Sequence, residues 1–187
     1  VDIGGGTTGI AILSLGDIVV DNTIRIAGDE MNQDIVDYVR EKYNILIGER
    51  SAEDIKIAIG SASPLKEEKE IEIQGRDLLS GLPKSIRFTS TEVREAISTS
   101  LTQITDAVKD AIEDTPPELI KDIYSDGIFV AGGGALIKGL DTYWKEELNI
   151  PINIVEEPMA AVAKGTSKML DHIDLLQRVQ RSWDEII

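Results

Sequence analysis

Two glycine clusters are the residues of this chain best suited to chemistry. The first lies in the segment Val1-Asp2-Ile3-Gly4-Gly5-Gly6-Thr7-Thr8, and the second, Gly132-Gly133-Gly134, follows a distant apolar stretch. Glycine lets the backbone take positive φ and turn its N–H groups toward an anion. No Gly-Lys-Ser/Thr follows the first cluster, and the apolar run Ile10 to Leu15 predicts a strand, which excludes a Walker A loop. The two clusters therefore predict a nucleotide held between two loops.

Several segments resemble the bacterial actin homologue MreB, a family within the superfamily of actin, sugar kinases and heat-shock chaperone ATPases. They are Val1 to Ser14, Ile24 to Met31, Ile47 to Glu53, Thr115 to Glu118 and Glu156 to Pro158. The resemblance runs over essentially the whole chain. It implies an α/β fold, the second actin-like (ribonuclease-H-like) domain, with a mixed sheet and a small inserted α+β subdomain. Family members also carry an earlier phosphate loop of the Asp-x-Gly-Thr type, so we expect this chain to be the C-terminal half of such a protein.

The resemblance also implies a function. We expect an ATP-binding, filament-forming cytoskeletal protein that determines cell shape by organising cell-wall synthesis. Its partners would be copies of itself, the missing N-terminal domain and, indirectly, the membrane-associated cell-wall machinery. It would be cytoplasmic and peripheral to the inner face of the membrane through parts outside this chain. The alternative is a non-polymerising ATPase of the same superfamily, either chaperone-like or a sugar kinase.

The resemblance assigns ATP and Mg²⁺ contacts to both glycine clusters. Asp2 would hold Mg²⁺ through water, because this ion prefers hard oxygen ligands. The β- and γ-phosphates would be bound by the amides of Gly4, Gly5, Gly6, Thr7 and Thr8, with the hydroxyl of Thr7 or Thr8 as an extra donor. Gly132, Gly133 and Gly134 would line the opposite wall. The structural alternatives are an aspartate that satisfies its own turn and glycines that only allow close packing of a helix on a strand.

A second group of candidates lies on one predicted helix. Glu53, Lys56 and Gly60 fall at i, i+3 and i+7, which places them on one helical face. By resemblance, Glu53 and Lys56 would hold the ribose and adenine, and Gly60 would leave room for the ring. The alternative is an ordinary surface Glu–Lys pair.

Gly9 departs from the family pattern. Most similar sequences have an acid directly after the paired threonines, at a position associated with orienting the attacking water. Because glycine cannot polarise water, we expect slow hydrolysis by the intact protein, with no residue assigned as catalytic. We expect no measurable ATPase activity from this chain alone.

The amino-acid composition argues against several other classes of protein. The formal net charge of −15 opposes non-specific nucleic-acid binding, which depends on cations that neutralise phosphates. The absence of cysteine excludes a disulfide scaffold and a thiolate metal site. No apolar run approaches the roughly 20 residues that span a bilayer.

Hydrophobic periodicity and turn residues predict alternating elements. We expect paired strands over 8–15 and 17–27, helices over 29–43, 52–59 and 93–113, and short strands over 70–74 and 85–89. Further along we expect strands over 127–131 and 150–155 and helices over 135–148 and 159–170. Ser51 and Thr115 are predicted helix N-caps, and Thr89 to Glu92 has the spacing of a capping box.

These elements give a domain division. Residues 1–48 and 91–156 would form actin-like domain IIA, and 49–90 the inserted subdomain IIB. Residues 157–187 would form helices that cross back toward the missing first domain. The apolar stripe from Ile173 to Ile187 would be part of that interface, and the single histidine, His172, would be a solvated or capping group.

Overall fold

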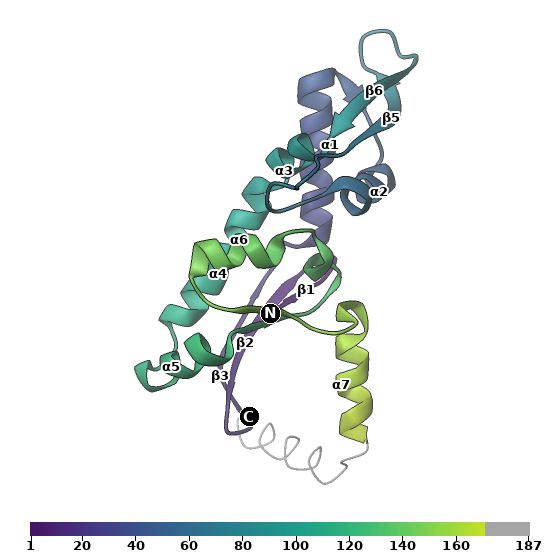
Figure 1. Ribbon diagram of the computed structural model, residues 1–187. Helices are drawn as coiled ribbons and strands as arrows, with labels where there is room; N and C mark the ends of the chain where they lie inside the picture. The colour runs from purple at the N-terminus through teal and green to yellow at the C-terminus, as the bar shows by residue number, and fades with distance from the viewer. Residues whose placement is uncertain (171–187) are drawn as a thin grey trace.

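The computed structural model describes residues 1–170 of the chain. Figure 1 shows two units joined by long helices, with α7 (Ala161–Leu170) beside the lower one. The predictions for His172, for the stripe from Ile173 to Ile187 and for the crossover beyond residue 170 lie outside the described residues.

The lower unit is built on a mixed sheet. Strand β2 (Thr8–Ser14) pairs antiparallel with both β1 (Asp2–Ile3) and β3 (Asp17–Ile24). A turn at Leu15 and Gly16, with positive φ at both residues, joins β2 to β3. Strand β7 (Ile128–Val130) pairs parallel with β8 (Ile152–Ile154) and lies parallel to β1, because the Ile3 amide donates to Ala131 (3.0 Å). This order, β3-β2-β1-β7-β8, confirms the predicted mixed sheet and α/β class.

Helices α4 (Ser98–Glu113) and α6 (Leu140–Leu148) pack on this sheet and on each other. The indole Nε1 of the buried Trp144 donates to the Thr105 hydroxyl at 3.0 Å, which satisfies its polar atom inside the core. Helix α5 (Pro117–Asp126) lies at the end of the unit and buries none of its residues.

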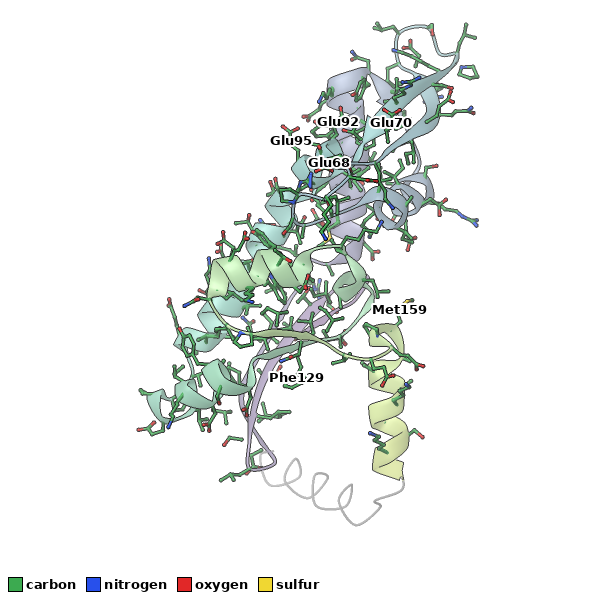
Figure 2. The ribbon with its side chains drawn as sticks, in the orientation of Figure 1. Glu68, Glu70, Glu92, Glu95, Phe129 and Met159 are labelled. Carbon is green, nitrogen blue, oxygen red and sulfur yellow. The ribbon has the colours of Figure 1, made fainter. Side chains whose placement is uncertain are left out.

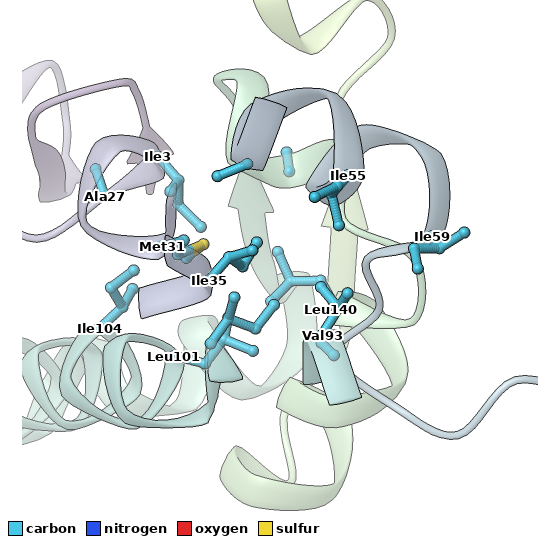
Figure 3. Close-up of a cluster of buried hydrophobic side chains, with 14 of the residues drawn as sticks. Ile3, Ala27, Met31, Ile35, Ile55, Ile59, Val93, Leu101, Ile104 and Leu140 are labelled. Carbon is cyan, nitrogen blue, oxygen red and sulfur yellow. The ribbon is translucent and has the colours of Figure 1, made fainter. Parts of the chain in front are cut away.

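The upper unit holds a second, smaller sheet of three antiparallel strands, β4 (Ile45–Leu46), β5 (Glu70–Asp77) and β6 (Pro83–Thr89). Helices α1 (Gly28–Tyr43), α2 (Glu49–Ile59) and α3 (Ser90–Ala96) pack together beside it. Its first strand, β4, precedes residue 49, the expected start of the insertion. Figure 3 shows that one apolar core joins both units, with Ile3, Met31, Ile35 and Leu101 close together.

The start of α3 is the best-defined helix end. Thr89 and Glu92 form the predicted capping box, with the Glu92 amide donating to Thr89 Oγ1 at 3.3 Å and the Thr89 amide to Glu92 Oε2 at 2.9 Å. Glu92 also accepts from the Tyr43 hydroxyl and pairs with Lys42 at 3.0 Å, and Figure 2 shows it near Glu95. Partial burial alone would raise the pKa of Glu92, but these hydrogen bonds lower it to about 2.

Four local predictions differ from the structure. Helix α2 starts at Glu49 after Gly48, so Ser51 is not its N-cap. The predicted helix over 93–113 is interrupted at Ile97. The Thr115 hydroxyl donates back to Ala111 (2.8 Å) instead of capping α5. The expected helix over 135–148 is a short 3-10 turn, η1 (Gly133–Leu136), followed by α6, because Gly139 between them has φ of 71°.

In the described part of the chain, no helix is long and apolar enough to cross a membrane.

Candidate nucleotide site

The first glycine cluster forms a tight loop between β1 and β2. The Gly4 amide donates to the Thr7 carbonyl at 2.9 Å, which closes the loop and removes that amide from the predicted phosphate donors. Gly5, Gly6 and Thr7 are exposed, and no group among residues 1–170 accepts from their amides. The loop therefore presents three unpaired N–H groups to solvent, an arrangement that suits an anion.

Gly4 is the glycine of this loop that is needed for space, and none of the three is needed for positive φ. None of Gly4, Gly5 and Gly6 has positive φ, so that part of the prediction is wrong. A Cβ on Gly4 would lie 3.2 Å from the Thr7 carbonyl oxygen. Glycine at position 4 therefore allows the loop to fold back on itself.

The loop rests on the first turn of α1. The amides of Gly28 and Asp29 donate to the carbonyls of Gly4 and Gly5 at 3.1 and 2.8 Å. These bonds satisfy amides that a helix N-terminus otherwise leaves unpaired, and they fix the loop in place. Gly28 allows this approach, since a Cβ there would lie 3.2 Å from the Gly4 carbonyl oxygen.

Gly28 and Asp29 were missed as site residues by sequence reasoning. Their signal was present, because a glycine followed by two acids before an apolar-periodic segment marks a helix start. That signal predicts where the helix begins, but it does not predict that the first glycine loop packs against the helix start. The Asp29 carboxylate oxygens would lie 3.5 and 3.6 Å from a Cβ on Gly5, so a negative charge borders the loop.

The two threonines of the loop have different roles. Thr7 is exposed and leaves its hydroxyl free to reach a ligand. Thr8 is fully buried, and its hydroxyl donates to the Ile26 carbonyl at 2.7 Å. The prediction that Thr8 could supply the extra hydroxyl donor is therefore wrong, and Thr7 is the available one.

Asp2 lies where the two glycine clusters meet. A Cβ on Gly132 would lie 2.4 Å from Asp2 Oδ1 and 2.3 Å from the Ile3 carbonyl oxygen, and Gly132 has φ of 83°. A Cβ on Gly134 would lie 2.3 Å from Ile3 Cγ2. Both glycines are thus required by packing of the second cluster on β1, the structural alternative considered above.

Gly133 differs from its neighbours. It is exposed and has no heavy atom within 4 Å of the position a Cβ would take. Leu136, at the end of the same turn, is 56% exposed. The second cluster therefore offers an open surface only at Gly133, whereas the Gly132 amide is used by the Pro158 carbonyl at 3.0 Å.

Lys56 links α2 to the first turn of α1, on which the first glycine loop rests. Its Nζ donates to the Gly28 carbonyl at 2.7 Å, and no ion pair with Glu53 occurs among residues 1–170. This excludes the ordinary surface pair. Burial lowers the pKa of the Lys56 ammonium, and the nearby Glu53 and Asp29 carboxylates oppose that shift.

Glu53 is exposed on the same helix, but Gly60 is buried. A Cβ on Gly60 would lie 2.3 Å from the Lys56 carbonyl oxygen. The space of the missing side chain is taken by the end of α2 itself. The interpretation that Gly60 leaves room for an adenine ring is therefore wrong.

Gly9 lies opposite Asp2 in the β1–β2 pair, so a side chain at position 9 would be on the same face as the Asp2 carboxylate. No heavy atom lies within 4 Å of the Cβ position, which leaves room for a larger residue. Asp2 and Gly9 also line a cavity of about 840 Å³ with Leu13, Ile123 and Phe129. The cavity is not the phosphate site, because Gly4 to Thr7 do not line it and its walls are mostly apolar.

The chain matches the family model for MreB/Mbl protein over residues 1–178. It is 49% identical over 178 residues to the cell shape-determining protein Mbl of Bacillus subtilis, covering 95% of this chain and 54% of that protein.

Two solved structures of MreB5 from Spiroplasma citri are also similar. The one bound to ADP has a TM-score of 0.90 at 44% identity, covering 92% of this chain and 52% of that one. The one bound to AMPPNP has a TM-score of 0.91 at 42% identity, covering 97% and 54%. The chain thus spans about half the length of the curated relatives it matches.

Proposed function

Because the chain belongs to the MreB/Mbl protein family, we propose that it forms one side of the ATP site in a filament-forming, actin-like protein that determines cell shape by organising cell-wall synthesis. The observation that carries the proposal is the exposed loop with unpaired amides at Gly5, Gly6 and Thr7, fixed on the first turn of α1. A nucleotide is supported as the ligand by the ADP and AMPPNP in the two Spiroplasma citri relatives.

The phosphates would be bound by the amides of Gly5, Gly6 and Thr7 and by the Thr7 hydroxyl. The Asp29 carboxylate beside the loop repels a bare phosphate, so the site favours one whose charge is offset by a cation. Asp2 fits the role of holding Mg²⁺ through water. Among residues 1–170 no group of three or more His, Cys, Asp or Glu side chains could hold a metal, so phosphate and water oxygens would complete the coordination. The bound ion would offset phosphate charge.

The nucleoside would lie between the two glycine segments. Gly133 and the exposed part of Leu136 offer one surface, and the exposed Glu53 carboxylate offers an acceptor for ribose hydroxyls. Lys56 would act through the Gly28 carbonyl, which it already binds, and so hold α1 and the phosphate loop in position.

The same proposal covers the domain division, the partners, the location and the rate of hydrolysis. Residues 1–48 and 91–156 would be domain IIA, 49–90 subdomain IIB, and 157–187 the return toward the first domain. The protein would assemble with copies of itself, lie in the cytoplasm near the inner face of the membrane, and act on the cell-wall machinery indirectly. Hydrolysis would be slow, because Gly9 supplies no group that orients water.

The test is electron microscopy of the full-length protein with and without ATP, beside calorimetric titration of ATP. We expect micromolar or tighter binding and filaments that depend on nucleotide. A protein that binds ATP but never forms filaments would contradict the cytoskeletal part, and one that binds no nucleotide would contradict the whole proposal.

A further inference from the structure

Residues 61–69, which join α2 to β5, bond to the segment that follows the second glycine cluster. We call these residues the strap. The Ala62 amide donates to the Lys138 carbonyl at 2.8 Å, and the Ser63 hydroxyl donates to the Gly139 carbonyl at 2.9 Å. Both donor residues are buried. Figure 1 shows the start of α6 below α2 and α3, where the two units meet, so the strap fixes this part of the lower unit against the upper one.

Arg94, on α3, holds the strap in place. Its Nη1 donates to the Ser63 carbonyl at 2.8 Å and to the Ser61 hydroxyl at 3.2 Å. Its Nη2 donates to Glu68 Oε1 at 2.5 Å, and Glu68 Oε2 accepts from the Ser90 hydroxyl at the start of α3. The Arg94 side chain is only 17% exposed. Because a guanidinium presents several N–H groups in one rigid plane, this single side chain binds both ends of the strap.

The surface proposed to face the nucleoside depends on the segments that flank it. Gly133 and Leu136 belong to η1, a single 3-10 turn, and such turns have poorer hydrogen-bond geometry than an α-helix. On one side of this turn, Gly132 packs against β1. On the other side, residues 138–139 are bonded to the strap. The position of the nucleoside surface therefore depends on the strap and, through it, on Arg94.

The phosphate loop has separate supports. Its carbonyls accept from the first turn of α1, and Lys56 bonds to Gly28 in that turn. Within the described part of the chain, no hydrogen bond or ion pair joins Arg94 or the strap to residues 4–8. The nucleoside half and the phosphate half of the site can therefore be perturbed separately.

We propose that Arg94 is a positioning residue for the nucleoside half of the ATP site, and that it acts through the strap without touching the nucleotide. The proposal rests on the nucleotide site proposed above and gives a role in it to a residue that lies outside it. If Arg94 only stabilised the fold, its loss would change the affinity for every phosphate ligand alike. A positioning role confines the loss to ligands that carry a nucleoside.

The test compares two ligands of the full-length protein in Mg²⁺. ATP meets both halves of the site, whereas inorganic triphosphate, titrated as a competitor of ATP, meets only the phosphate loop. Arg94→Met removes the guanidinium and keeps an apolar stem. It should weaken ATP binding about tenfold, below the roughly 100-fold that a misplacement of about 1 Å can cost, and leave the inhibition constant of triphosphate nearly unchanged. The control is Arg87→Met, on β6 and outside the strap, whose side chain is 81% exposed; it should match the wild type for both ligands.

Ser63→Ala tests the same link without removing a charge. It deletes the hydroxyl that donates to the Gly139 carbonyl. That carbonyl keeps the Tyr143 amide as a donor at 2.9 Å, so the variant should fold normally. We expect ATP affinity to fall about threefold, as for the loss of one hydrogen bond, and triphosphate binding to stay at the wild-type level.

The outcomes separate this proposal from the proposed function. Wild-type ATP affinity in both variants would overturn the positioning role, as would equal losses for ATP and triphosphate. If Arg94→Met does not fold, Ser63→Ala decides by the same two criteria. A wild-type protein that binds neither ligand would contradict the proposed function itself, and the positioning role with it.

Discussion

Two adjacent glycines should respond in opposite ways to the same substitution. Gly132→Ala places a Cβ at φ of 83°, 2.3 Å from the Ile3 carbonyl oxygen and 2.4 Å from Asp2 Oδ1. The backbone strain costs about 1–3 kcal/mol and the forced shift of β1 about 1–3 kcal/mol more. The sum, roughly 2–6 kcal/mol, is a large part of the 5–15 kcal/mol that typically stabilises a fold.

Gly133→Ala is the matched control. Its Cβ meets no heavy atom within 4 Å, and its φ is not positive, so stability should change by no more than about 0.5 kcal/mol. The added methyl group nevertheless extends onto the surface proposed to face the nucleoside. We expect the affinity of the full-length protein for ATP to fall about tenfold, which corresponds to about 1.4 kcal/mol.

Thermal unfolding followed by circular dichroism and calorimetric ATP titration separate the two effects. A chain of this size loses about 2–4 °C in Tm per kcal/mol, so Gly132→Ala should lower Tm by at least about 4 °C. Gly133→Ala should keep the wild-type Tm and bind ATP more weakly. An unchanged Tm in Gly132→Ala would refute the packing argument, and wild-type ATP affinity in Gly133→Ala would remove that residue from the site.

Three further changes test single residues in the full-length protein. Asp2→Ala should weaken ATP binding in Mg²⁺ and leave binding in chelator nearly unchanged; equal losses in both titrations would argue against an ion at Asp2. Gly9→Glu should raise steady-state phosphate release by less than the about 10²–10⁴-fold typical of a well-placed general base, without tighter binding; wild-type turnover in assembled protein would show that position 9 is irrelevant. Glu92→Gln should lower Tm at pH 7, and because hydrogen bonds lower the pKa of Glu92 to about 2, the wild type loses this advantage as pH falls from about 4.5 toward 2. A Tm difference that stays constant over that range would contradict the role of the Glu92 carboxylate.

The sequence was sufficient to predict elements that depend on interactions between residues close together in the chain. Apolar spacing predicted α1 almost to the residue, and Thr89 with Glu92 predicted the capping box, because both depend on side chains within one or two turns. The strand pair expected over 8–15 and 17–27 also forms, with its turn at Leu15 and Gly16, because the two strands are adjacent in sequence.

Features that depend on distant segments were not predictable in the same way. Glycine is required at position 132 by β1, which lies far away in sequence. Thr8 has the same local signal as Thr7, but only the position of Ile26 shows that its hydroxyl is used. Lys56 reads as half of a surface pair until α1 is placed beside α2.

Two helix ends also differ from the prediction: the break at Ile97 inside the helix expected over 93–113, and the start of α2, for which Ser51 was the expected N-cap. Helix α3 ends and α4 begins at Ile97, a fully buried residue whose φ of −81° and ψ of 0° depart from the helical values. Gly48 precedes α2 without a side-chain cap, so the usual preference for serine at this position misled the prediction.

The central claim is that the loop amides of Gly5, Gly6 and Thr7 bind nucleotide phosphate. Its most direct test is a ¹⁵N-detected amide titration of the full-length protein with ATP and Mg²⁺. We predict large, saturable shifts of these three amide resonances, with little change for the Gly4 amide, which is already bonded to Thr7. Saturable ATP binding that leaves the resonances of Gly5, Gly6 and Thr7 unmoved would contradict the account.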